Sequence, residues 1–89
     1  MKVIGAKWTV MVLRELYEDK KRFGELLTSL SPISPRTLSA RLSELERHGI
    51  IKKKIYAEVP LHVEYYLTPR GESLKDIILK IHDWGARTA

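Results

Sequence analysis

Arginines and small side chains share one face of a helix predicted near the middle of the chain. In residues 34–48, "SPRTLSARLSELERH", three leucines recur at helical spacing, and a helix that turns them inward turns a second row outward. That row consists of Arg36, Ala40, Ser43 and Arg47. Arginine can bind guanine through two hydrogen bonds, and small side chains let a helix enter the major groove closely. The pattern predicts DNA contact; a solvated face with two arginines is the alternative.

Hydroxyl side chains lie beside this row at the start of the helix. Thr37 and Ser39 flank it and can bond bases or phosphates. Ser34 can cap the helix, and we also count it among the candidate DNA contacts. Arg47, near the far end, is better placed for a backbone phosphate.

A second group of candidate contacts follows in the segment of residues 51–67. Lys52 and Lys54 are two positions apart, so they share one face of a predicted strand. They could flank a minor groove or a row of phosphates; alternatively, they protect a sheet edge from unwanted pairing, as lysines often do. Residues 57–61 carry one acid and no cation, so His62 is the only DNA contact we expect near this tip.

The sequence has no arrangement typical of an enzyme or a metal site. Its histidines, His48, His62 and His82, are scattered, and none pairs with another at metal-ligand spacing. The glycines form no phosphate-binding loop. The absence of cysteine excludes disulfides and thiolate metal sites. We therefore expect neither catalysis nor a cofactor.

The charge distribution fits a polyanionic partner. The 89 residues carry a net charge of +5. Residues 1–33 hold six Lys or Arg against four acids, residues 34–62 six against three, and residues 63–89 four against four. A basic balance alone is weak support for nucleic-acid binding. No apolar run is long enough to span a membrane, and no secretory pattern begins the chain, so we expect a cytoplasmic protein.

The elements that position these residues begin with two helices. Residues 7–17 are apolar nearly all round and predict a buried helix. Residues 23–30 predict a helix with one apolar stripe, which Pro32 follows and terminates. The charged segment "EDKKR" between them is predicted to be a turn.

A capped helix, a hairpin and a last helix follow. Ser34 and Pro35 begin the third helix, residues 34–48, and Gly49 ends it. Period-two alternation on both sides of a long tip predicts a hairpin over residues 51–67. Thr68 and Pro69 begin a helix predicted to span residues 69–86. We expect residues 1–89 to form a single, mainly α-helical domain with a small β-hairpin, a winged helix-turn-helix.

Four motifs follow one another along the chain, "KW", "RFGEL", "IS...L..RL.ELE..G" and "P..VEY.LT..G". In these residues, and from Ile4 to Gly85, the chain resembles the HxlR-type transcriptional regulators, relatives of the MarR group. The resemblance implies a homodimeric repressor or activator that binds double-stranded DNA, with the helix from Ser34 in the major groove and the hairpin as the wing. It also implies that the first and last helices build the dimer. The residues assigned to that interface are Trp8, Met11, Val12, Leu74, Ile77, Ile78, Ile81 and Trp84; plain core packing is the alternative.

Two features depart from the family pattern. Many relatives carry a segment before the first motif, often with a cysteine that senses thiol or aldehyde stress. Here the chain begins almost at the motif and has no cysteine, so we expect that sensing chemistry to be absent. Relatives often have a basic residue after the tip proline, where this chain has Leu61 and His62, so no arginine is available at that position to enter the minor groove. Contact with phosphates alone is one alternative, and the sequence does not show whether the wing enters the groove.

A winged helix used for protein contact is the alternative function. It predicts an apolar or mixed outward face on the third helix, whereas the face here is cationic. A steep loss of duplex affinity with salt distinguishes the two functions. The sequence identifies no effector and no operator.

Overall fold

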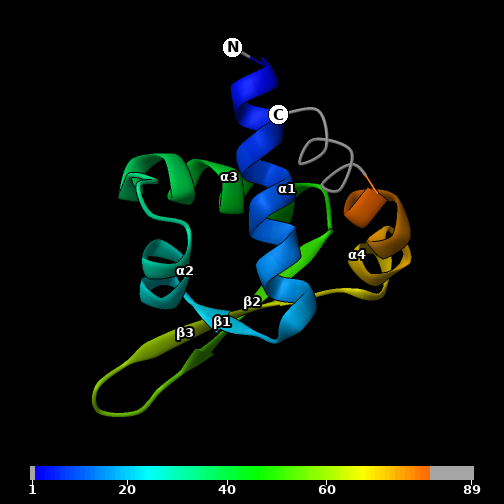
Figure 1. The fold of residues 1–89 in the computed structure, drawn as a ribbon. Coiled ribbons are helices and arrows are strands. Elements are labelled where there is room, and N and C mark those ends of the chain that lie inside the picture. Colours follow the sequence, from blue (N-terminus) through cyan, green and yellow to red (C-terminus); the bar gives the residue numbers. More distant parts are fainter. Residues whose placement is uncertain (1, 81–89) are drawn as a thin grey trace.

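The chain folds around a long first helix. The computed structural model describes the backbone of residues 2–80 and the side chains of residues 7–80. Its elements are α1 (Lys2–Glu18), β1 (Lys21–Arg22), α2 (Phe23–Ser29), α3 (Pro35–Arg47), β2 (Ile51–Tyr56), β3 (His62–Leu67) and α4 (Pro69–Ser73). In Figure 1, α2 and α3 lie on one side of α1 and α4 on the other, and the β2–β3 hairpin projects beyond the helices. The mainly helical fold with a small antiparallel sheet confirms the predicted fold class.

Apolar side chains from the first three helices and β2 meet in one core. The buried members are Val12, Leu13, Leu16, Leu26, Leu30, Ile33, Leu38, Leu42, Leu45 and Ile51. The three leucines of α3 belong to this set, as their spacing predicted. Val12 is 0% exposed, so it packs in the core and not at a surface, contrary to the dimer assignment. A helix that is apolar nearly all round does not show from its sequence which face the core will take.

A short strand before α2 completes a three-stranded antiparallel sheet in the order β1-β3-β2. Lys21 pairs with Tyr65 and Arg22 with Glu64, so the prediction of a simple turn at "EDKKR" was wrong for these two residues. Lys21 Nζ also lies 3.3 Å from a carboxylate oxygen of Glu15 in α1. A two-residue strand shows no alternation, and its partner lies far along the chain, so the local sequence gave no signal for it.

The two ends of α3 are formed as the sequence predicted. The Oγ of Ser34 accepts a hydrogen bond of 3.1 Å from the backbone N–H of Thr37. At the other end Gly49 has φ of 71°, a left-handed conformation that glycine adopts without strain. The N–H of Ile50 then donates to the carbonyl of Leu45 over 3.0 Å. These bonds satisfy backbone groups that a helix end would otherwise leave unpaired.

Thr68 joins the end of the hairpin to the end of α3. Its side chain is buried, with 7% of the residue exposed. The hydroxyl donates toward the carbonyls of Gly49, at 2.7 Å, and Ile50, at 3.0 Å, and accepts from the N–H of Gly71 at 3.1 Å. Tyr17 of α1 donates to the carbonyl of Gly71 over 3.0 Å. One junction therefore fixes α1, α3, the hairpin and α4 relative to one another.

The predicted helix over residues 69–86 is interrupted. α4 ends at Ser73, Leu74 forms a turn, and residues 75–80 are again helical. The N–H of Leu74 donates to the carbonyl of Gly71, three residues back, which tightens the chain at this point. Beyond the turn, Ile78 packs against the core. The first helix also starts earlier than predicted, at Lys2 rather than residue 7.

Candidate DNA-binding surface

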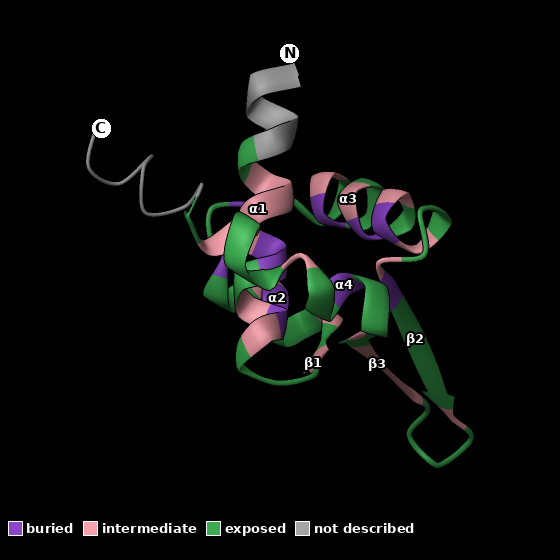
Figure 2. Ribbon diagram, turned by 90° about the vertical axis from the view of Figure 1, so that its right-hand side faces the viewer, coloured by how far each residue is buried: buried purple, intermediate pink, exposed green. Residues whose placement is uncertain are grey.

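The outward row of α3 is exposed along the length of the helix. Burial of the leucines at positions 38, 42 and 45, which are 0%, 1% and 3% exposed, fixes the rotation of the helix about its axis. Figure 2 shows the buried residues of α3 on one face and exposed residues on the other. The exposed set includes Arg36, Ala40, Ser43 and Arg47. The predicted row therefore exists as a surface, with a cation near each end and small side chains between them.

The hydroxyl groups at the start of α3 are organised by the helix cap. Ser34 donates its hydroxyl hydrogen to Thr37 Oγ1 over 2.9 Å while it accepts from the Thr37 backbone. Both functions of the Ser34 hydroxyl are therefore used within the protein. Thr37 accepts in this pair and keeps its own hydroxyl hydrogen to donate outward. Ser39 is exposed one residue beyond Leu38.

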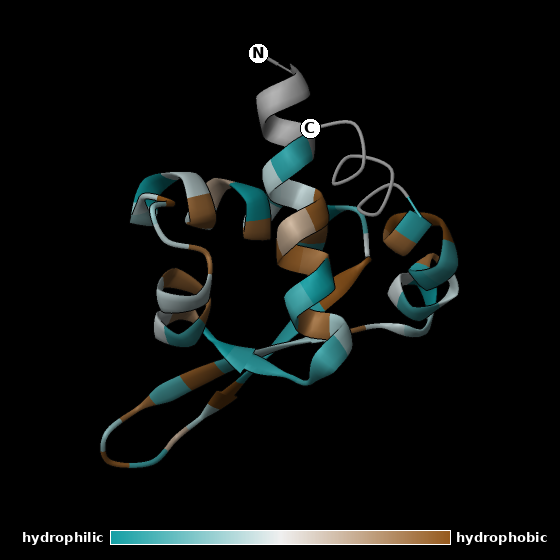
Figure 3. Cartoon of the chain, viewed as in Figure 1, coloured by the Kyte–Doolittle hydropathy of each residue, from teal (hydrophilic) through white to brown (hydrophobic). Residues whose placement is uncertain are grey.

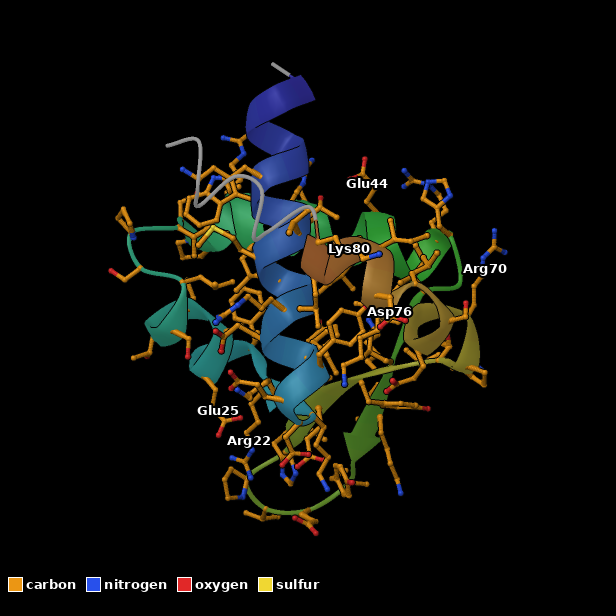
Figure 4. All side chains as sticks on the ribbon, turned by 45° about the vertical axis from the view of Figure 1, so that its right-hand side comes forward. Arg22, Glu25, Glu44, Arg70, Asp76 and Lys80 are labelled. Carbon is orange, nitrogen blue, oxygen red and sulfur yellow. The ribbon has the colours of Figure 1, made fainter. Side chains whose placement is uncertain are left out.

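Arg41 is a further cation of α3, which the spacing of the outward row did not indicate. Its Nε lies 3.8 Å from a carboxylate oxygen of Glu44, the acid at the margin of the outward row. The same Nε is buried and has no hydrogen-bond partner among the described residues. Glu44 points away from the body of the protein in Figure 4. Helical ion pairs at this spacing stabilise by only a few tenths of a kcal/mol, about 0.2–0.5, but the pair offsets a negative charge beside the arginines.

The outer face of the sheet carries a second group of cations. The register places Lys52 opposite Tyr66 and Lys54 opposite Glu64, which confirms that the two lysines share a strand face. Arg22 in β1 stands opposite Glu64 from the other side, so its side chain belongs to the same face. All three cations are exposed. Arg22 could not be found from the sequence, because the strand that positions it was not predicted.

His62 was predicted to contact DNA, which needs an accessible side chain, but it lies partly enclosed by the hairpin. Its ring stacks on Tyr56 with 4.5 Å between centroids, and its side chain is 17% exposed. Nδ1 lies 3.7 Å from a carboxylate oxygen of Glu58, and Nε2 lies 3.7 Å from one of Glu64. These contacts hold the imidazole between two acids of the hairpin and do not favour a contact with phosphate.

Three tyrosines of the fold have perturbed acidity. A hydrogen bond with Glu64 is the main cause that raises the pKa of Tyr56. Burial raises the pKa of Tyr65 and of Tyr17, and the nearby carboxylates of Glu46 and Glu72 add to the effect in each case. All three remain neutral hydroxyls at neutral pH, so they add no charge to the surface.

A wide-open hollow of about 610 Å³ lies beside β1 and α2. It is lined by Lys21, Arg22, Gly24, Glu25, Thr28 and Ser29. The N–H of Arg22 donates to Glu25 over 2.7 Å, and Figure 4 shows the two side chains near one another. Effector sites for small molecules are mostly clefts that bury most of the ligand surface, whereas this hollow lies wide open to solvent.

No metal-binding cluster of three or more His, Asp or Glu occurs among the described residues. Within the same part of the chain, no helix has the length and apolar character needed to cross a membrane. Of the candidate dimer residues, Ile81 and Trp84 lie outside the described residues.

Comparison with known proteins gives consistent matches. Residues 3–89 match the HxlR-like helix-turn-helix family. The HTH-type transcriptional regulator sll1512 of Synechocystis sp. is 44% identical over 84 residues, which are 94% of this chain and 62% of that protein. YdeP of Bacillus subtilis, also an HTH-type transcriptional regulator by name, is 42% identical over 85 residues, 96% of this chain and 66% of that protein. The chain therefore spans less than two thirds of the length of these relatives.

Solved structures agree with the sequence matches. A crystal structure described as a transcriptional regulator of the MarR family from Porphyromonas gingivalis W83 has a TM-score of 0.85 at 38% identity. The match covers 100% of this chain and 87% of that one. Both the helices and the hairpin are thus shared with a regulator of that group.

Proposed function

Because the chain belongs to the HxlR-like helix-turn-helix family, we propose that it regulates transcription as a homodimer that binds an inverted repeat in double-stranded DNA. The exposed row of α3 is the observation that carries this proposal. The major groove admits an α-helix, and recognition helices contact base edges mainly through their N-terminal residues. Arg36 lies in the first turn of α3 and is exposed. It is the residue we assign to direct contact with a base, with Thr37 and Ser39 beside it.

The other cations are assigned to the phosphate backbone. Arg47 lies in the last turn of α3. Lys52, Lys54 and Arg22 lie on one face of the sheet, behind the tip of the hairpin. Phosphate contacts set the position of a protein on the duplex without specifying its sequence. We therefore expect these four side chains to determine affinity and its salt dependence, and Arg36 to determine specificity.

Homodimerisation is supported by apolar surface on α1 and after α4. Ile77 is 58% exposed in the part of the chain that the structure describes, so its side chain is available for burial against a second copy. Trp8, Met11 and Leu74 are partly buried in the single chain and keep some surface for further burial. A twofold dimer of winged helices would place two α3 helices in successive major grooves, about 34–36 Å apart. The preferred site is then an inverted repeat with half-sites about one helical turn apart.

Selection of bound duplexes from a random pool tests this function. The expected result is enrichment of a sequence with twofold symmetry and half-sites about 10 base pairs apart. Recovery of unrelated sequences without symmetry would contradict specific binding by a dimer. Sedimentation that shows a monomer at micromolar concentration would contradict the dimer by an independent route.

Substitution of the two arginines of α3 separates their roles. Arg36→Ala is expected to weaken specific binding by about 1–3 kcal/mol and to relax the preference at one base pair of each half-site. Arg47→Ala is expected to weaken binding to selected and random duplexes equally, because a phosphate contact carries no sequence information. Equal losses for Arg36→Ala on both duplexes would instead make Arg36 a phosphate contact.

A further inference from the structure

The tip of the hairpin exposes a concentrated apolar surface. Among the described residues, five large hydrophobic side chains are exposed, and four of them lie on the hairpin. Three of these belong to the tip or its immediate base, Val59 at 101%, Leu61 at 64% and Ile55 at 58% exposed. Figure 3 shows apolar colouring at the outer end of the hairpin, where it projects beyond the helices. Such a surface costs solubility and commonly marks a contact site.

The charges around this tip suit a polyanion. Lys52 and Lys54 are exposed on the strand that leads to the tip. The acid of the tip, Glu58, has a carboxylate oxygen 3.7 Å from His62 Nδ1 and a side chain that is 63% exposed, and the two exposed lysines outweigh its single charge. An apolar end with cations behind it matches the minor groove of a duplex, where two rows of phosphates flank a floor of bases and sugars. A protein pocket for the same tip would need acidic groups around an apolar centre.

We propose that the wing inserts Val59 and Leu61 as an apolar wedge into the minor groove, at a base step outside the bases contacted by α3. This inference rests on the proposed function and extends it. Apolar side chains that enter the minor groove partly unstack a base step and bend the duplex. Pyrimidine–purine steps such as TA deform most easily. The wing therefore adds a preference for a flexible step at a fixed distance from each half-site, although the tip carries no cation.

The test compares Leu61→Ala, Leu61→Met and Lys54→Ala with the unmodified protein. The probe is the best duplex recovered from the random pool by the unmodified protein, together with a copy in which the flexible step is replaced by a purine–purine step. Because Leu61 is exposed, its substitutions leave the core intact, and equal urea midpoints check this. Affinity is measured at several salt concentrations, and the bend is measured by energy transfer between dyes at the duplex ends.

Leu61→Ala is expected to lower affinity about tenfold for each half-site, from the loss of a buried leucine side chain in each subunit. Its salt dependence stays unchanged, because no charge is removed, and the duplex is bent less. Leu61→Met keeps the apolar area and is expected to bind within about twofold of the unmodified protein. Lys54→Ala is expected to flatten the salt slope by about two instead, because each bound dimer loses two lysines. Replacing the flexible step by a purine–purine step should lower the affinity of the unmodified protein more than that of Leu61→Ala, because only the unmodified protein inserts Leu61 at that step.

Two results would overturn the proposal without affecting the proposed function. One is that Leu61→Ala binds and bends the selected duplex as the unmodified protein does, which would leave the tip to a protein partner. The other is an equal loss for Leu61→Ala and Leu61→Met, which would show that apolar area is not what matters. If the unmodified protein binds no duplex at all, the proposed function fails, and this inference fails with it.

Discussion

The two helix caps of this protein look alike in sequence, yet their substitution should have different costs. Ser34-Pro35 begins α3 and Thr68-Pro69 begins α4, and each hydroxyl accepts from the backbone N–H three residues on. Ser34 is exposed, so water can replace its side chain. Thr68 is buried and also donates to the carbonyl of Gly49. The expected difference comes from that second bond and from burial.

The magnitudes follow from these contacts. Loss of an exposed cap costs about 1 kcal/mol, so Ser34→Ala should lower the free energy of unfolding by about that amount. Thr68→Ala loses a cap of the same kind and also the hydrogen bond to the carbonyl of Gly49, and a hydrogen bond of this type contributes about 0.5–1.5 kcal/mol. We expect a total of about 1.5–2.5 kcal/mol. Thr68→Ser keeps the hydroxyl and loses one methyl group, at a cost of about 1 kcal/mol.

Urea unfolding of the three variants at one protein concentration measures these differences. The protein concentration is held constant because dimerisation would make apparent stability depend on it. The expected order of stability places Ser34→Ala and Thr68→Ser close together and Thr68→Ala well below them, with an unchanged dependence on urea. If Ser34→Ala and Thr68→Ala cost the same within about 0.5 kcal/mol, burial and the second hydrogen bond of Thr68 add nothing to stability.

Two further predictions concern the same junction. A Cβ at position 71 would collide with the carbonyl oxygen of Ile50 and lie 2.9 Å from Leu67 Cδ2. Gly71→Ala should therefore destabilise the fold, although alanine favours helices. Gly24→Ala is the control, because a Cβ at that position meets nothing within 4 Å, and it should not destabilise the fold. Thermal unfolding of both variants measures the difference. The folded-state pKa of Tyr17 is raised above its ordinary value of 10.0, so the folded protein holds this proton more tightly than the unfolded chain. The stability that this group contributes is present below pH 10 and is lost as pH rises through the raised pKa. The free energy of unfolding, measured across that pH range, should therefore fall less steeply in Tyr17→Phe than in the unmodified protein. An identical decline in both proteins would exclude the contribution of Tyr17.

The parts of the fold that could be predicted are those whose signals are local. The cap at Ser34, the leucines of α3 and the left-handed Gly49 all act within one short segment, so spacing and residue type were sufficient. The alternation of the hairpin is local in the same sense, and it placed Lys52 and Lys54 on one face correctly.

The parts that could not be predicted depend on contacts between distant segments. The strand that carries Arg22 forms only because β3, some forty residues later, presents an open edge. At the turn, the N–H of Leu74 donates to the carbonyl of Gly71, and Gly71 itself fits closely against Ile50, a contact that no helical pattern reveals. The burial of Val12 and the enclosure of His62 likewise follow from how neighbouring elements pack, and both changed the roles expected from sequence.

The salt dependence of duplex binding tests the central claim most directly. If the outward row of α3 and the cations of the sheet hold DNA in a dimer, about six to ten phosphates are neutralised. Affinity for the selected duplex should then fall roughly a thousandfold or more between about 50 and 200 mM salt. Absence of duplex binding at the lower concentration, or an affinity that does not change with salt, would contradict the account.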